Sequence, residues 1–269
     1  MTHPLGVAHL TAINLPPPAF IEAAARAGFE CVGLRLLRVT DTTPGYPLMD
    51  DPALMRATRR ALTSTGLVVN DIEFVRITPE LDPAGLRPFL DGGAELGARH
   101  VIAAPYDPDL SRLADRLGTL SLLATDRGLG VVLEFFPWTV VPDLSSALAM
   151  VNAAGDKVGV LVDSLHFDRS ASSLDVLRAT PATLLPFVHL ADAPVHPPYT
   201  EADLLHTARD ERLPPGEGQV NLVDFLAALP AGVPVAAEVP MTAATLSLGE
   251  NAVLKRVAAG CRSLLEIKT

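Results

Sequence analysis

The most informative part of the chain is Gly159-Val160-Leu161-Val162-Asp163-Ser164-Leu165-His166. An apolar run long enough for a short strand ends in a carboxylate, and an imidazole follows three residues later. Such a run is typical of a strand that is buried on both faces, as the strands of parallel sheets are. Asp163 is therefore predicted to lie where the strand ends and a loop begins, which is where parallel α/β folds carry their active sites.

The same pattern occurs three more times, with apolar runs that end in Glu134, His189 and Glu238. Consecutive ends are separated by one βα unit of about 25 to 35 residues, with an insertion before Glu238. Neighbouring parallel strands would bring two Glu, one Asp and one His to the same end of a sheet. Such an oxygen-rich set with one imidazole suits a hard divalent ion. We expect one ion, Mn²⁺ in the first place, with Mg²⁺, Co²⁺ or Zn²⁺ as alternatives.

Each strand-end residue also has a simpler interpretation. A carboxylate at such a place is often a helix N-cap or a solvated loop residue, and a single histidine is often a core or rim residue. The coincidence of four such residues, each closing an apolar run, favours the metal site.

Strands of about five residues alternate with helices about eight times, which predicts a single (β/α)₈ barrel over residues 1–269. The expected strands lie within 5–10, 31–36, 67–77, 100–104, 129–134, 159–163, 184–189 and 233–238. A long polar, proline-rich segment follows the seventh strand at about 193–219. Long loops in compact domains are usually functional, so this segment is predicted to cover the catalytic face.

Composition limits the partners. The chain has 269 residues, 49% of them hydrophobic, a net charge of −10 and a pI of about 5.1. The negative charge argues against nucleic acid and anionic membrane surfaces as partners. No cationic start with an apolar run after it and no apolar run of about 18 residues is present, so a cytoplasmic protein with a small-molecule partner is expected. A homo-oligomer is compatible with these features.

Aromatic residues make up 5% of the chain, yet Phe135, Phe136 and Trp138 come directly after Glu134. Trp138 is the only tryptophan and is the best candidate for the wall of a substrate pocket.

Together these residues resemble the xylose isomerase-like TIM-barrel superfamily of sugar phosphate isomerases and epimerases. The most specific motifs are Asp163-x-x-His166, His189-Leu190-Ala191-Asp192, and Arg212 with Pro215-Gly216-Glu217-Gly218. The resemblance implies that Glu134, Asp163, His189 and Glu238 bind one divalent metal. It also implies substrate contacts from His166 and Arg212, and it makes Asp192 a further candidate. The ketose 3-epimerases of this superfamily place a Glu and an Arg at the positions of Val140 and Val195, so an ordinary free ketohexose is not the expected substrate.

The predicted reaction is isomerisation or epimerisation of a sugar or polyol ketone. Glu134 and Glu238 would remove and return a proton next to the carbonyl, through an enediolate that the metal stabilises. The same intermediate also allows a lyase or dehydratase that acts on a keto-inositol or 3-keto-glycoside, which is the alternative function. Two further alternatives are an endonuclease IV-like phosphodiesterase, which needs more histidine, and a barrel that senses a metal or sugar without catalysis.

Overall fold

The computed structural model describes residues 4–40 and 43–267. Across these residues, parallel strands form a closed barrel in the order β1-β2-β3-β4-β5-β6-β7-β8. The strands are β1 (Leu5–Val7), β2 (Cys31–Arg35), β3 (Val68–Ile77), β4 (His100–Pro105), β5 (Gly130–Glu134), β6 (Val158–Asp163), β7 (Val188–Leu190) and β8 (Val235–Ala237). Parallel pairing of Leu5 with Val235 and of Val7 with Ala237 closes the ring. The predicted (β/α)₈ barrel is confirmed.

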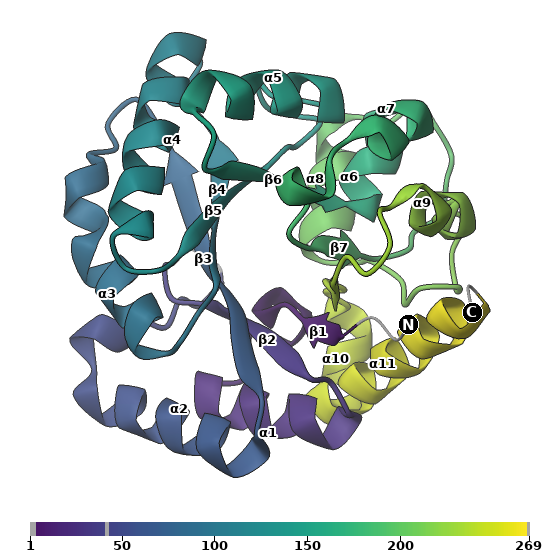
Figure 1. Ribbon diagram of the computed structural model, residues 1–269. Coiled ribbons are helices and arrows are strands. Elements are labelled where there is room, and N and C mark those ends of the chain that lie inside the picture. The colour runs from purple at the N-terminus through teal and green to yellow at the C-terminus, as the bar shows by residue number, and fades with distance from the viewer. Residues whose placement is uncertain (1–3, 41–42, 268–269) are drawn as a thin grey trace.

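Helices surround the ring of strands on its outer side (Figure 1). Those that follow the first five strands are α1 (Pro17–Ala27), α2 (Pro52–Thr65), α3 (Arg87–Glu95), α4 (Leu110–Thr125) and α5 (Leu144–Ala154). The later ones are α6 (Ser164–Arg169), α7 (Leu174–Ala179), α8 (Glu201–Arg209), α9 (Leu222–Ala228), α10 (Thr242–Leu248) and α11 (Glu250–Ile267). Short 3-10 turns are η1 (His9–Ala12), η2 (Leu48–Asp50), η3 (Pro83–Leu86) and η4 (Ala182–Leu184).

The ends of α2 follow directly from local sequence. Asp51 accepts hydrogen bonds from the backbone N–H groups of Ala53 and Leu54, and Pro52 occupies the first helical position. Gly66 ends the helix in the left-handed conformation, with φ of 74°, which glycine adopts without steric cost.

Three strands are shorter than the sequence predicted. The strand β1 ends at Val7, and the turn η1 takes up the end of the expected first strand, including His9. The turn η4 occupies the start of the expected seventh strand, and β8 begins after Pro234. Pro186 and Pro234 lack the N–H that a central strand donates to its neighbour, so pairing can begin only after them. The short helices α6, α8 and α10 were not predicted, because each has at most nine residues and a weak apolar period.

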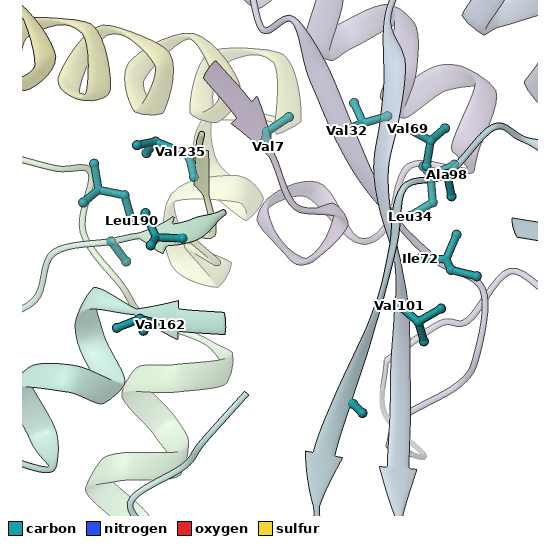
Figure 2. Packing of buried hydrophobic residues seen from close by; sticks show 14 of the residues in the cluster. Val7, Val32, Leu34, Val69, Ile72, Ala98, Val101, Val162, Leu190 and Val235 are labelled. Atoms are coloured by element: carbon teal, nitrogen blue, oxygen red, sulfur yellow. The ribbon is translucent and has the colours of Figure 1, made fainter. Parts of the chain in front are cut away.

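The strands bury both faces, and successive residues alternate between the two. One set, which includes Val32, Ile72 and Val162, belongs to the large core that also contains helix residues such as Phe20 and Leu117; Figure 2 shows several of these side chains on the strands. A second, small cluster fills the barrel interior and consists of Ile102, Val132, Leu161 and Phe187, with Phe74 packed against it. The side chains of this cluster make the barrel interior apolar below the strand ends.

The segment 193–219 contains α8, whose N-terminus is fixed by reciprocal hydrogen bonds between Thr200 and Asp203. An antiparallel bridge between Asp192 and Leu213 joins the start of the segment to its later part, and a second bridge between Glu211 and Met241 ties it to the chain after β8. Within the described part of the chain, no helix combines the length and the apolar character needed to cross a membrane.

Candidate metal centre and substrate cavity

The four strand-end residues lie at the mouth of the barrel because they continue its inner face. Each stands two residues after an inward-facing position: Glu134 follows Val132, Asp163 follows Leu161, and His189 follows Phe187. Glu238 stands two residues after Ala236, just past the end of β8. A two-residue step in a strand returns the side chain to the same face. All four side chains therefore converge above the small apolar cluster inside the barrel.

One potential ligand atom from each of Glu134, Asp163, His189 and Glu238 lies within 4.8 Å of the others. All four side chains are buried. One oxygen of Glu134 and both ring nitrogens of His189 have no hydrogen-bond partner among the described residues. Buried polar atoms without partners are costly, and three carboxylates with one imidazole are ligands that divalent ions accept. The residues present therefore fit a divalent ion.

Asp163 also serves as a helix cap. One carboxylate oxygen accepts the backbone N–H of Leu165 at 2.7 Å and of His166 at 3.4 Å, which starts α6. The other oxygen accepts a hydrogen bond from Arg212 at 2.6 Å. The cap and the ligand interpretations of this residue are thus compatible, because the two oxygens face different partners.

Arg212 is buried and joins the segment 193–219 to the cluster. Besides Asp163, its guanidinium contacts Glu238 at 3.0 Å and donates to the Glu238 backbone carbonyl at 2.9 Å. Its Nε donates to the carbonyl of Ala208 at 3.0 Å. Arg212 therefore neutralises part of the negative charge and fixes the two carboxylates that it contacts.

The two glutamates have opposite electrostatic environments. Burial by itself raises the pKa of Glu238, but Arg212 and His189 outweigh it and hold that pKa well below its usual range. Burial and the charge of Glu238 raise the pKa of Glu134 well above its usual range. Environments that separate the pKa values of two carboxyl groups are typical of acid and base pairs.

The histidines also differ. Burial lowers the pKa of His189, but the surrounding carboxylates, Glu238 first, raise it to about 10. His166 lies 3.9 Å from Glu134 and has a pKa lowered to about 4, mainly by burial. The surrounding carboxylates therefore favour the protonated form of His189, whereas burial favours the neutral form of His166.

A cavity of about 220 Å³ opens beside the cluster, here named the inner cavity. Glu134, Glu238 and Arg212 line it on the cluster side. Part of its wall is aromatic and consists of Phe74, Tyr106, Phe136 and Trp138. The indole N–H of Trp138 reaches the Tyr106 hydroxyl at 3.4 Å, and the ring of His166 stands edge-on to Phe136 and Trp138. The inner cavity thus has a charged floor and an apolar wall.

Asp192 lies apart from this arrangement. Its two oxygens accept hydrogen bonds from the backbone N–H groups of Ala193, Gly216, Gly218 and Val220. A side chain on Gly218 would collide with the carboxylate of Asp192. Asp192 therefore holds the Pro215–Gly218 turn in place, and it is not among the residues that line the inner cavity.

Arg35 and Glu73 were not predicted as site residues. They form a buried ion pair at 2.8 Å, and Arg35 lines the inner cavity. Arg35 is the last residue of β2 and stands two residues after Gly33, whose missing side chain leaves room for Asp71. The same rule of a polar residue that ends an apolar strand would have found Arg35.

Comparison with known proteins agrees with this architecture. Residues 21–242 match the family described as xylose isomerase-like TIM barrel. An inosose isomerase from Bacillus velezensis is 30% identical over 145 residues, half of this chain and half of that protein. The chain thus spans about half the length of the curated relatives it matches.

Two solved structures have the same fold. The crystal structure of the IOLI protein with a binding zinc atom has a TM-score of 0.81 and 19% identity, covering 98% of this chain and 99% of that one. A D-psicose 3-epimerase crystallised in the presence of D-fructose has a TM-score of 0.71 and 16% identity, covering 97% and 99% of the two chains.

Proposed function

This chain belongs to the xylose isomerase-like TIM-barrel family, and from that premise we propose that it is a divalent-metal-dependent isomerase or epimerase of a sugar or polyol ketone. The main observation behind the proposal is that Glu134 and Glu238 each take part in two places. Both belong to the buried four-residue cluster, and both line the inner cavity. They can therefore reach an ion and a substrate at the same time.

Glu134, Asp163, His189 and Glu238 would hold the ion. When bound, a divalent ion supplies Lewis-acid chemistry, which stabilises the negative charge that develops on oxygen when a neighbouring carbon loses its proton. Mn²⁺ is the ion we favour, because three of the four ligand groups are hard carboxylates.

The two glutamates would move the proton. Glu238, kept ionised by Arg212, would take the proton from the carbon next to the carbonyl, and Glu134 would return a proton to the intermediate. Delivery to the opposite face of the same carbon inverts it, whereas delivery to the neighbouring carbon exchanges ketone and aldehyde. Arg212 positions both Asp163 and Glu238, and Arg35 offers a second cation to substrate oxygens.

His166 and Trp138 would orient the substrate. His166 lies beside Glu134, and its buried Nδ1 has no hydrogen-bond partner among the described residues, so its ring can hydrogen-bond a substrate hydroxyl. The aromatic wall with Trp138 suits the apolar C–H face of a ring-shaped polyol. A keto-inositol therefore comes first among substrates to test, in agreement with the name of the curated relatives.

The test is metal analysis of the purified protein, followed by incubation with keto-inositols and keto-sugars in D₂O and mass spectrometry of the products. About one divalent ion per chain, with deuterium on the carbon next to the carbonyl, is the expected result. Metal binding without exchange on any of these ketones would favour a sensor. Failure to bind Mn²⁺, Mg²⁺, Co²⁺ or Zn²⁺ would contradict the proposal.

A lyase or dehydratase is the second candidate. Val140 and Val195 stand where ketose 3-epimerases carry charged substrate contacts, and Val140 is 40% exposed. The aromatic wall also suits a less polar leaving group. Product mass decides between the candidates, since loss of water or of an aglycone cannot arise from isomerisation.

The endonuclease-like alternative has less support. Such a site needs several zinc ions and more histidine, whereas in residues 4–40 and 43–267 one group could hold an ion, and it contains a single histidine.

A further inference from the structure

A second cavity of about 210 Å³ lies beside the inner cavity, here named the outer cavity. The two share four wall residues: Leu10, Thr43, Arg209 and Asp210. The rest of the outer cavity is lined by Thr11, Ile13, Asn14, Pro44, Pro240, Met241, Thr242, Thr245, Leu246 and Glu250. It is thus a continuation of the barrel mouth on the side of β8, and it contains no residue of the proposed metal cluster.

The size of the two cavities suggests that one ligand occupies both. Ligand pockets usually measure about 300 to 1,000 Å³. Each cavity alone is smaller than that, at about 220 and 210 Å³, whereas the two together reach the usual range. A free monosaccharide would fill the inner cavity and leave the outer one unused.

The walls of the outer cavity combine apolar surface with hydrogen-bonding groups. Ile13, Met241 and Leu246 supply the apolar part, and Leu246 is 85% exposed. Glu250 supplies an acceptor: one of its oxygens accepts from Asn14 at 3.3 Å, and the other is buried with no partner among the described residues. A ring with an apolar face and hydroxyl donors matches these walls.

We propose that the outer cavity binds a second hydroxylated ring that is attached to the reacting ring, so that the substrate is a glycoside-like ketone. The inference rests on the proposed function, because that function places the reacting ring in the inner cavity. Glu250 accepts a hydrogen bond from a hydroxyl of the second ring, and Leu246 packs against its apolar face.

The test compares ligands of one and two rings on the Mn²⁺-loaded protein by calorimetry. The probes are methyl β-D-glucoside, cellobiose and phenyl β-D-glucoside. We expect cellobiose to bind at least tenfold more tightly than methyl β-D-glucoside. Thr245→Trp fills the outer cavity and should remove that advantage without changing the affinity for the one-ring probe.

Leu248→Trp is the matched control, because Leu248 lies on the same helix, α10, is 60% exposed and stands outside the cavity walls. Its affinities should equal those of the wild type. Equal binding of the one-ring and two-ring probes, no binding of either, or an advantage that survives in Thr245→Trp would overturn the proposal. If phenyl β-D-glucoside, but not cellobiose, binds more tightly than methyl β-D-glucoside, the outer cavity prefers an apolar ring, and the proposal of a hydroxylated second ring is wrong. Deuterium exchange on a one-ring keto-inositol is measured separately and tests the proposed reaction alone. A protein that shows exchange but no preference for two-ring ligands would keep the proposed function and lose the second-ring proposal.

Discussion

The two halves of the barrel mouth are built by the same rule but hold opposite kinds of polar cluster. Along β5 to β8, strand-end residues bring three carboxylates and one imidazole together, with Arg212 as the added cation. Along β2 and β3, strand residues bring Arg35 against Glu73. The first cluster has three carboxyl groups for one arginine, whereas the second is a one-to-one pair of Arg35 with Glu73.

Where a strand-end residue lies and which charges surround it therefore have to be considered separately. A polar residue at the inward-facing end of a strand reaches the mouth in either half. Only an excess of carboxylates makes a bound cation favourable, because a balanced pair already satisfies its own charge. Substitutions in each half, and the response of the metal cluster to pH, test this contrast.

The largest effect is expected for Glu238→Gln, which removes one proposed proton carrier and one ligand charge. Deuterium incorporation into a keto-inositol at saturating Mn²⁺ should fall by up to about 10⁴-fold, the range for loss of a general acid or base. Circular dichroism should remain unchanged. Glu217→Gln, at a surface ion pair with Arg256, is the control and should keep full activity; wild-type activity in Glu238→Gln would remove the two-carboxylate mechanism.

Arg35→Met should destabilise the protein by about 3–5 kcal/mol, because it leaves Glu73 buried and unpaired. The double variant Arg35→Met with Glu73→Leu should recover most of that loss. Urea denaturation measures both. Arg59→Met, at an exposed pair with Glu95, should cost less than about 1 kcal/mol. If Arg35→Met costs as little as Arg59→Met, the ion pair of Arg35 and Glu73 contributes to stability only as an exposed pair does.

His189→Gln should weaken Mn²⁺ binding by about 100-fold or more, since loss of residues that only support ligands already costs about 10- to 100-fold. Calorimetric titration of the metal-free protein with Mn²⁺ measures it directly. His206→Gln, on the exposed face of α8, serves as the comparison. Unchanged affinity in His189→Gln would remove the β7 ligand from the site.

Metal affinity should rise with pH. His189 has a pKa of about 10 in the metal-free protein, and only its neutral form binds an ion, so binding must release that proton. Between pH 6 and 8 the apparent affinity for Mn²⁺ should increase at least about tenfold per pH unit, because His189 releases one proton and Glu134, whose pKa is also raised, adds to the release. A titration in buffers of different ionisation enthalpy counts the released protons. A flat profile would mean that His189 is already neutral without metal.

Much of this architecture follows from patterns that are local in the chain. The eight apolar runs predicted the barrel because each is continuous in the chain and a helical segment separates it from the next. Glu134, Asp163, His189 and Glu238 were found for the same reason, since a charged residue that closes an apolar run is conspicuous in the chain.

Other features depend on contacts between distant segments. Arg35 ends β2 in the same way, yet its partner Glu73 lies inside the long strand β3, where the apolar period gives no sign of a pair. The helices α8 and α10 are short and carry weak helical patterns, so they depend on tertiary contacts: α8 buries Ala208, and α10 packs against α11.

The amino-acid sequence alone sets which residues reach the barrel mouth, because strand alternation and strand ends are local properties of the chain. What those residues face there depends on the tertiary fold. Asp192 turns towards the backbone of the Pro215–Gly218 turn, Arg212 towards Asp163 and Glu238, and Arg35 towards Glu73. Charge balance, burial and the two adjoining cavities are sums over residues far apart in the chain, and closure of the barrel is what brings those residues together.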